Sequence, residues 1–290
     1  MNTFEKRAAV MNRLLRMQSV AHAPRDGRGI YLGDGIPYTS NAEIRSQDLI
    51  DLIDSINFLE IEKITPTFRT HILRDTGVEI LSRKYGFEEF LDYFRKNNLS
   101  NELPYHNEYH SYQMVLNCFE GAQYLGVSNK HEIKILLIAA LFHDFNHSGG
   151  TLSDADNIKK AIAGLFTAND CYELLDVDSL NKCIKCIEYT QYPYTSVATE
   201  STLQCIIRDA DLMSVYEETD TIILSQFQGL YSEICIQKPD LTFNDFIEGY
   251  DKFLRSIVWQ TAWGIEKAHQ LYFDNRREYL KLLLITNKPT

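Results

Sequence analysis

The stretch of sequence that decides the fold spans residues 135–149 and reads ILLIAALFHDFNHSG. Its first eight residues, Ile135–Phe142, form the longest apolar run in the chain, and this run predicts a buried helix. His143 and Asp144 follow directly. An imidazole and a carboxylate at the end of a buried helix are costly unless something compensates them, and a divalent metal ion is the simplest compensation. Imidazole and carboxylate together suit zinc, manganese, iron or magnesium.

A second segment carries two more histidines a short distance upstream. It spans residues 105–110 and reads YHNEYH, so His106 and His110 are four residues apart and would share one face of a helix. Five of the eight histidines fall within residues 106–147. This clustering predicts that side chains from several helices meet at one polar site.

The two segments together resemble the class I cyclic-nucleotide phosphodiesterases of the HD superfamily of metal-dependent phosphohydrolases. The resemblance rests on YHNxxH followed by HDxxHxG and covers about residues 85–285. It implies an all-α fold, an HD-domain or phosphodiesterase-like helical bundle, and hydrolysis of a 3′,5′-cyclic nucleotide to the 5′-monophosphate. The expected partner is therefore a small-molecule nucleotide, and neither a nucleic-acid polymer nor a membrane is expected.

The resemblance also implies the ligands of two divalent metal ions. His110, His143, Asp144 and Asp211 would hold the first ion, which would be zinc, iron or manganese. Asp211 lies in the segment RDADL of residues 208–212. Asp209 is its rival, but on a helix the two carboxylates point in different directions.

The second metal would be magnesium or manganese, held by Asp144 and water. After His147 the next histidine is His269, so the sequence offers no further imidazoles for this site. Oxygen-rich coordination favours hydrolysis over redox chemistry. The resemblance assigns His106 as the general acid that protonates the leaving oxygen and His147 as a supporting residue beside the water.

Substrate selection is where the chain departs from the family. The family has a glutamine three residues before a phenylalanine, and both grip the base; here Tyr250 and Phe253 occupy those places. Gln260 is out of register. Tyr105, Tyr250 and Phe253 are the expected substrate-binding residues. Alternatives are an HD phosphohydrolase acting on a nucleotide monoester or a signalling oligonucleotide, an HD-type di-iron oxygenase, and a nucleotide sensor without activity.

Composition narrows the class of protein further. Hydrophobic residues make up 44% of the 290 residues, and the net charge of −11 argues against a nucleic-acid-binding surface. No apolar run is long enough to cross a bilayer, and the first ten residues lack the apolar core of a signal peptide. The six cysteines are then reduced thiols of a cytoplasmic protein, with Cys183 and Cys186 at buried helix positions. The oligomeric state does not follow from the sequence.

The chain is expected to contain an N-terminal helix and Gly-rich loop or flap in residues 1–48 and a catalytic domain in residues 49–290. A loop or short hairpin would occupy residues 22–48, and another helix would begin at Tyr105. Further helices are predicted at residues 3–21, 49–61, 78–96 with a break at Gly86, 131–142, 154–166 with Ser153 as the cap, 180–188, 202–215, 219–236, 243–268 and 275–284.

Overall fold

The computed structural model describes residues 31–32, 36–37, 67–194, 201–213, 220–271 and 285. The chain divides into two compact units, Met1–Asn57 and Phe58–Thr290. In the first unit the described residues form one antiparallel pair of short strands, β1 (Tyr31–Leu32) and β2 (Ile36–Pro37). The predicted boundary after residue 48 and the predicted helices at 3–21, 49–61 and 275–284 lie outside the described residues.

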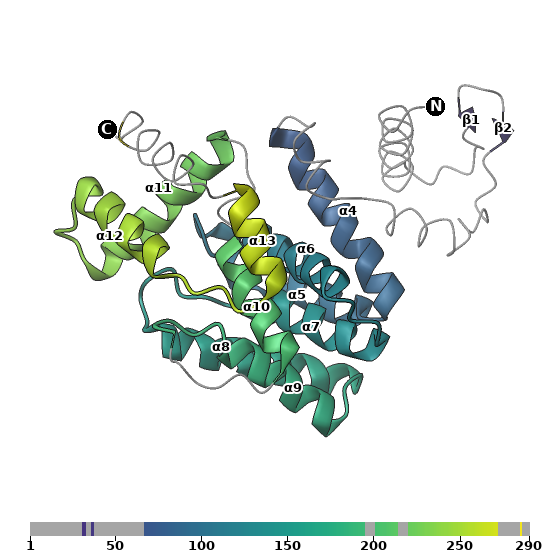
Figure 1. Ribbon diagram of the computed structural model, residues 1–290. Helices are drawn as coiled ribbons and strands as arrows, with labels where there is room; N and C mark the ends of the chain where they lie inside the picture. Colours follow the sequence, from purple (N-terminus) through teal and green to yellow (C-terminus); the bar gives the residue numbers. More distant parts are fainter. Residues whose placement is uncertain are drawn as a thin grey trace. The chain divides into compact units, whose positions relative to one another are not determined.

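The second unit confirms the predicted all-α fold, because each regular element among its described residues is a helix (Figure 1). In chain order these are α4 (Thr67–Tyr85), α5 (Glu88–Asn97), the short 3₁₀ helix η1 (Leu99–Glu102), α6 (Glu108–Tyr124), α7 (Lys130–Phe142), α8 (Asp154–Tyr172), α9 (Val177–Glu188), α10 (Thr202–Met213), α11 (Asp220–Gln237), α12 (Phe243–Ser256) and α13 (Ala262–Leu271).

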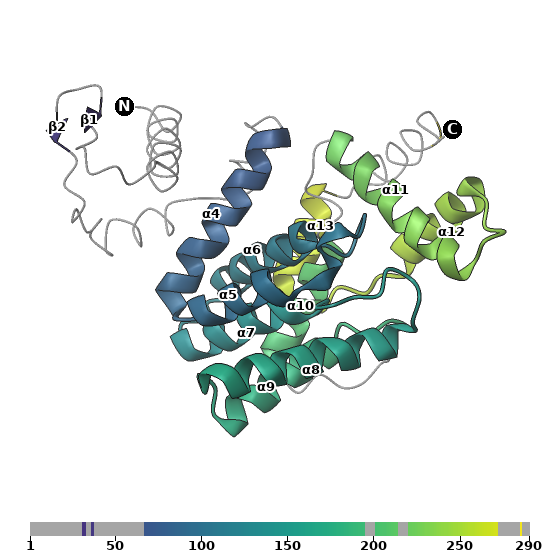
Figure 2. The same ribbon diagram turned by 180° about the vertical axis from the view of Figure 1, so that it is seen from behind.

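Helix α7 is the centre of this unit. Every side chain from Ile135 to Phe142 is fully buried, and α7 contacts α4, α5, α6, α8, α9 and α10, as Figure 2 shows from behind. Burying a leucine, isoleucine or phenylalanine side chain contributes roughly 1.5–3 kcal/mol, so this helix is a large part of the core. The helix ends at Phe142, and His143 is its C-cap. The apolar run therefore places His143 and Asp144, residues of the types that bind metal ions, at the edge of the core, as predicted.

Two helix starts follow from capping side chains. Ser153 caps α8 by accepting a hydrogen bond from the backbone N–H of Asp156, as the sequence predicted. Asn107 caps α6 by accepting from the N–H groups of Tyr109 and His110, so α6 begins at Glu108. His106 therefore lies before the helix, and the expectation that it shares a helix face with His110 is wrong.

The predicted helix over residues 243–268 is also wrong, because α12 and α13 are separated by residues 257–261. Thr261 caps α13, because its hydroxyl accepts from the N–H of Gly264 (2.8 Å). Asp209 holds the backbone just before this helix: its carboxylate accepts from the N–H groups of Gln260 (2.9 Å) and Thr261 (2.8 Å) and from the hydroxyl of Thr261 (2.7 Å). A Cβ on Gly264 would lie 2.3 Å from Oδ2 of Asp209, so glycine permits this close approach. A local cap and a tertiary contact together fix the start of α13.

Helices α11 and α12 pack on each other and form a second apolar cluster. Phe227 and Phe246 are buried in it, and Tyr250 and Phe253 pack against it.

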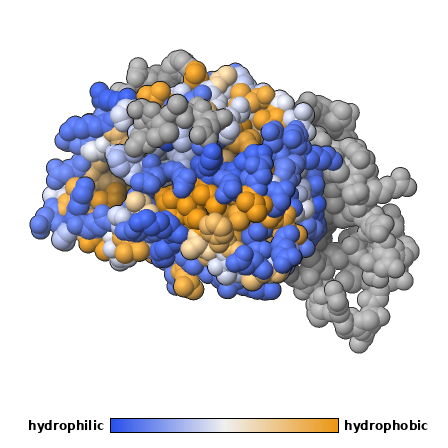
Figure 3. Space-filling model, turned by 90° about the horizontal axis from the view of Figure 1, so that it is seen from below, coloured by the Kyte–Doolittle hydropathy of each residue, from blue (hydrophilic) through white to orange (hydrophobic). Residues whose placement is uncertain are grey.

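No helix among the described residues has the length and apolar character needed to cross a membrane. Seen from below, apolar side chains on the surface are mixed with hydrophilic ones (Figure 3).

Candidate metal centre

Three helices bring four potential ligands to one point. His110 stands in the first turn of α6, His143 and Asp144 follow the last turn of α7, and Asp211 lies in the last turn of α10. The Nε2 atoms of the two histidines are 3.1 Å apart. Oδ2 of Asp144 lies 3.2 Å from Nε2 of His110 and 3.0 Å from Nε2 of His143. Oδ1 of Asp211 lies 3.4 and 3.8 Å from the same two nitrogen atoms.

The hydrogen bonding of His143 shows that the four ligand atoms can bind a cation. Its Nδ1 lies 2.8 Å from the carbonyl oxygen of Ala140, and a carbonyl can only accept, so the proton is on Nδ1. The lone pair on Nε2 therefore points at Nε2 of His110. A proton on His110 can bridge only part of this cluster, whereas a cation can bind all four atoms. Ligand atoms about 2.0–2.1 Å from a tetrahedral zinc ion lie about 3.3–3.4 Å from one another, and the observed separations of 3.0–3.8 Å bracket this value.

The electrostatics of the cluster also favour a cation. Burial opposes the charged form of His110, but hydrogen bonds to Asp144 and Asp211 outweigh it and raise its pKa to about 10. The pKa of His143 is raised for the same reasons, since the charge of Asp144 overcomes the effect of burial. Burial opposes ionisation of Asp144, but the nearby imidazoles, His143 first, hold its pKa well below the usual value. Two anionic carboxylates thus stabilise positive charge at this point.

A second group of possible ligands shares the same helix end and consists of His106, Asp144 and His147. The ring of His106 stacks on that of His147, with centroids 3.6 Å apart and planes inclined by 28°. Asp144 is 15% exposed, so it can reach toward both groups. The structure thus brings together His106, His110, His143, Asp144, His147 and Asp211, which the sequence singled out.

Glu233 on α11 holds His106 in place, although sequence reasoning missed this residue. Its Oε2 lies 2.5 Å from Nδ1 of His106, and its Oε1 accepts from the N–H groups of Tyr105 (2.7 Å) and His106 (3.2 Å). The Glu233 side chain is 3% exposed. Burial opposes its ionisation, but the bonds and the charge of His106 outweigh burial and lower the pKa of Glu233.

His147 is held as a neutral imidazole. Ser148 donates its N–H to Oδ1 of Asn157 (3.0 Å), so the amide group of Asn157 faces Nε2 of His147 (2.9 Å), and the N–H of Gly149 faces Nδ1 (3.2 Å). Both ring nitrogens thus meet donors, and neither neighbour can accept a proton from a charged ring. Burial, together with the nearby imidazole of His106, lowers the pKa of His147 to about 4. A neutral ring beside His106 avoids repulsion between two charged imidazoles.

Asp154 is a second residue that sequence reasoning did not connect with the site, because its position at the start of α8 explained it fully. Its carboxylate accepts from the N–H of Tyr192 (2.7 Å). Burial raises the pKa of Asp154 to about 6, and the charges of Asp144 and Asp211 add to this effect. Asp154 is therefore close enough to Asp144 and Asp211 for their charges to raise its pKa, and it lies at the edge of the metal centre.

The expected substrate-binding residues lie in two places. The ring of Tyr105 contacts those of His106 and His110, with centroids 4.7 and 5.1 Å apart. Tyr250 packs between Phe227 and Phe253, with centroids 4.5 and 5.7 Å apart. Burial raises the pKa of Tyr250, and the charge of Asp211 adds to this.

Phe253 also meets the rings of Tyr192 and Tyr194, at 5.8 and 6.5 Å. These rings therefore form one aromatic cluster that joins residues 192–194 to α12. Gln260 is not among its rings, and its side-chain amide donates to the carbonyl of Val258 (2.6 Å).

The fold and site define a helical protein with a nitrogen- and oxygen-rich centre suited to divalent cations. No protein-family model matches the chain, and no curated protein matches it. Solved structures do match it. One of them, "Structure of LmjPDEB1 in complex with IBMX", is 15% identical, with a TM-score of 0.51 over 83% of this chain and 98% of that chain. At this identity the likeness establishes the fold, which is the helical, phosphodiesterase-like fold of that structure.

Proposed function

We propose that this chain is a metal-dependent phosphohydrolase that hydrolyses a 3′,5′-cyclic nucleotide to the 5′-monophosphate. The observation that carries the proposal is the convergence of two imidazoles and two carboxylates from α6, α7 and α10. Their atoms lie 3.0–3.8 Å apart, and a second imidazole pair lies beside them. The structural likeness to LmjPDEB1, a class I cyclic-nucleotide phosphodiesterase, agrees with this proposal at the level of the fold.

The two metal ions would occupy separate sites. His110, His143, Asp144 and Asp211 would hold one ion, which we propose to be zinc, iron or manganese. Asp144 and water would hold the second, for which magnesium or manganese suits an oxygen-rich site. Two such ions supply Lewis acidity toward the phosphate oxygens and activate water for attack on phosphorus.

His106 is the proposed general acid. Cleavage of a cyclic phosphodiester releases O3′ as an alkoxide, which leaves readily only when it is protonated. Nδ1 of His106 is held by Glu233, so Nε2 is the atom free to carry a proton to O3′. Glu233 also fixes the backbone of Tyr105 and His106, so it orients the imidazole. His147 stays neutral and packs against the ring that carries the proton.

Base recognition in this proposal relies on aromatic side chains. Phe253 takes the position of the family's phenylalanine, whereas Tyr250 stands where the family has its glutamine, and Tyr192 and Tyr194 contact Phe253. Stacking on aromatic rings tolerates different bases, whereas a side-chain amide reads hydrogen-bonding groups. We therefore propose that the enzyme accepts both purine cyclic nucleotides. Tyr105, which packs on the two histidines, would lie beside the phosphate.

The test combines metal analysis with product analysis. Protein purified without chelators should hold about one tightly bound transition metal ion per chain and a second, exchangeable divalent ion. With both present it should convert cyclic AMP or cyclic GMP to the 5′-monophosphate. His143→Ala should lose the tight ion and this activity together. Wild-type protein without stoichiometric metal would refute the scheme. Hydrolysis of nucleotide monoesters alone would replace the proposed substrate with the alternative one.

A further inference from the structure

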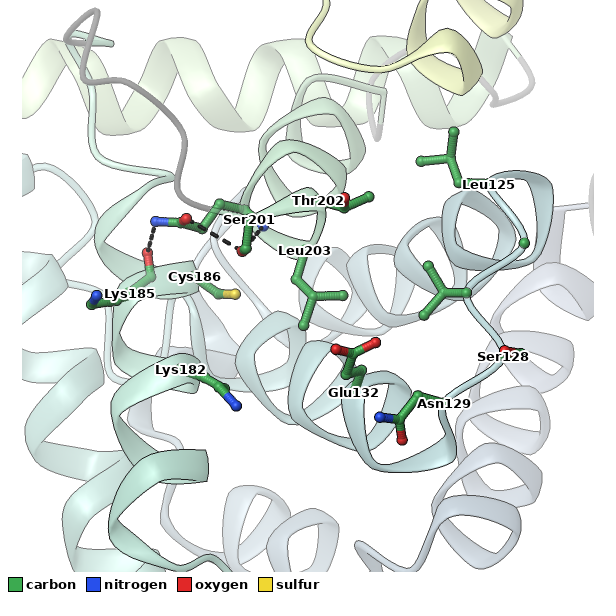
Figure 4. A pocket seen from close by; sticks show the side chains of 13 residues that line it. Leu125, Ser128, Asn129, Glu132, Lys182, Lys185, Cys186, Ser201, Thr202 and Leu203 are labelled. Atoms are coloured by element: carbon green, nitrogen blue, oxygen red, sulfur yellow. Dashed lines mark hydrogen bonds between the residues drawn. The ribbon is translucent and has the colours of Figure 1, made fainter.

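A cavity of about 610 Å³ lies away from the metal centre, between the connection from α6 to α7, the first turn of α7, helix α9 and the start of α10 (Figure 4). Binding sites for small molecules commonly have volumes of about 300–1,000 Å³. Nothing in the proposed hydrolysis uses this cavity, so its residues call for a separate explanation.

The cavity lies at the other ends of the helices that carry the proposed metal ligands. Helix α7 lines it with Glu132 in its first turn and reaches the metal centre only at His143, eleven residues and roughly 16 Å later. Thr202 begins α10 at the cavity, and Asp211 stands in the last turn of the same helix. The cavity is therefore separate from the centre and is not an extension of it.

One part of the cavity wall is apolar. Leu203 points into the cavity in Figure 4, and Val127 and Cys186 also line it. Leu203 and Cys186 are buried, at 7% and 1% exposure, so their side chains meet the cavity from within the core. Burial raises the pKa of the Cys186 thiol to about 12, so this surface is uncharged and behaves as an apolar one.

Charged side chains of both signs line the cavity. Lys182 and Lys185 belong to α9, and Glu132 belongs to the neighbouring helix α7, where it lies near Lys182 (Figure 4). Lys182 pairs with Asp178 at 2.7 Å, but these side chains are 51% and 77% exposed. An exposed ion pair of this kind contributes about 0–1 kcal/mol, so the ammonium group can turn to another anion at little cost.

We infer that this cavity is a second binding site, which takes a small molecule with an apolar body and one anionic group. The apolar body would pack against Leu203 and Val127. The anionic group would lie at the α9 side, where two lysines, Lys182 and Lys185, line the cavity against the single carboxylate of Glu132. This site stands independently of the proposed phosphohydrolase activity, since none of its lining residues belongs to the metal centre.

Two matched dyes test the inference. 8-Anilinonaphthalene-1-sulfonate has an apolar body and one anionic group, and N-phenyl-1-naphthylamine is the same body without the sulfonate. Fluorescence titration of the whole metal-loaded chain should show one saturable site for the anionic dye, with weaker binding of the neutral dye. Lys182→Glu should weaken the anionic dye by at least about threefold, since it reverses a charge at the site. It should leave the affinity for the neutral dye within a factor of two.

Lys159→Glu is the control. Lys159 is another exposed helical lysine, paired with Asp156 at 2.8 Å, and it does not line the cavity. Its reversal should leave both titrations unchanged, and circular dichroism should show that both variants keep the helical content of the wild type. The inference is overturned if the wild type has no saturable site for the anionic dye. It is also overturned if Lys182→Glu has no effect or no more effect than Lys159→Glu, or if it weakens both dyes equally.

Discussion

Two aspartates on α10, two residues apart, offer a sharp test of the proposed ligand set. The same substitution, aspartate to asparagine, should affect a different property at each position. Asp209 is fully buried, and its carboxylate accepts from Gln260 and Thr261 at the start of α13. Asp211 is 21% exposed and faces Nε2 of His110 at 3.4 Å. We predict that Asp209→Asn impairs stability and that Asp211→Asn impairs metal binding.

The magnitude for Asp209→Asn follows from its three hydrogen bonds. An asparagine keeps one oxygen as an acceptor, but its amide group must then face at least one N–H or O–H donor. A buried donor without a partner costs about 1–3 kcal/mol. For a unit of this size that lowers Tm by about 2–12 °C. Thermal unfolding should show this loss, while metal analysis should find the wild-type metal content in the folded variant.

Asp211→Asn removes a charged ligand and leaves the cap of α13 untouched. The affinity for the tight metal ion should fall by at least about tenfold to a hundredfold, the range seen even when partners of metal ligands are changed. Competition with a chelator of known affinity measures this change. Our assignment is refuted if Asp209→Asn loses metal while Asp211→Asn keeps it. It is equally refuted if both variants bind metal as the wild type does.

Three further predictions concern the surroundings of the centre. Glu233→Gln should keep metal content and folding but reduce kcat by roughly tenfold to a hundredfold, because it loosens His106; an unchanged kcat would contradict the positioning role. The pKa of His110 is raised to about 10, so near pH 7.5 the metal-free cluster carries a proton that metal must displace. Calorimetry in buffers of different ionisation enthalpy should then show proton release on metal binding, and metal affinity should rise with pH until it levels above about 10; uptake of protons would have the wrong sign. Cyclic AMP and cyclic GMP should have kcat/KM values within about a factor of ten, because stacking tolerates either base; a strict preference that Gln260→Ala abolishes would mean that the glutamine was misplaced.

The sequence was sufficient for the parts of the fold that depend on neighbouring residues. The apolar run Ile135–Phe142 predicted a buried helix ending at Phe142, and Ser153 predicted the start of α8; both are confirmed. Cys183 and Cys186 are buried, free thiols on α9, as their spacing indicated. Local periodicity and capping chemistry carry this information directly.

The errors arose where distant residues act on local structure. The backbone at the start of α13 is held by Asp209, which lies 51 residues before Gln260. Glu233 reaches His106 across 127 residues, and no motif marks it. The position of His106 before α6 could have been predicted, because asparagine is a strong N-cap residue and Asn107 stands next to it.

The most direct test of the central claim compares His106→Gln with the wild type on two phosphodiesters that differ in their leaving group. On a cyclic nucleotide, whose leaving group is the O3′ alkoxide, the variant should lose roughly 10²–10⁴-fold in kcat while keeping its metal. On bis(4-nitrophenyl) phosphate, whose leaving group departs without a proton, most of that loss should be recovered. His110→Gln is the control and should lose metal and activity on both substrates. Equal losses on the two substrates for His106→Gln, or loss of metal from that variant, would contradict the account.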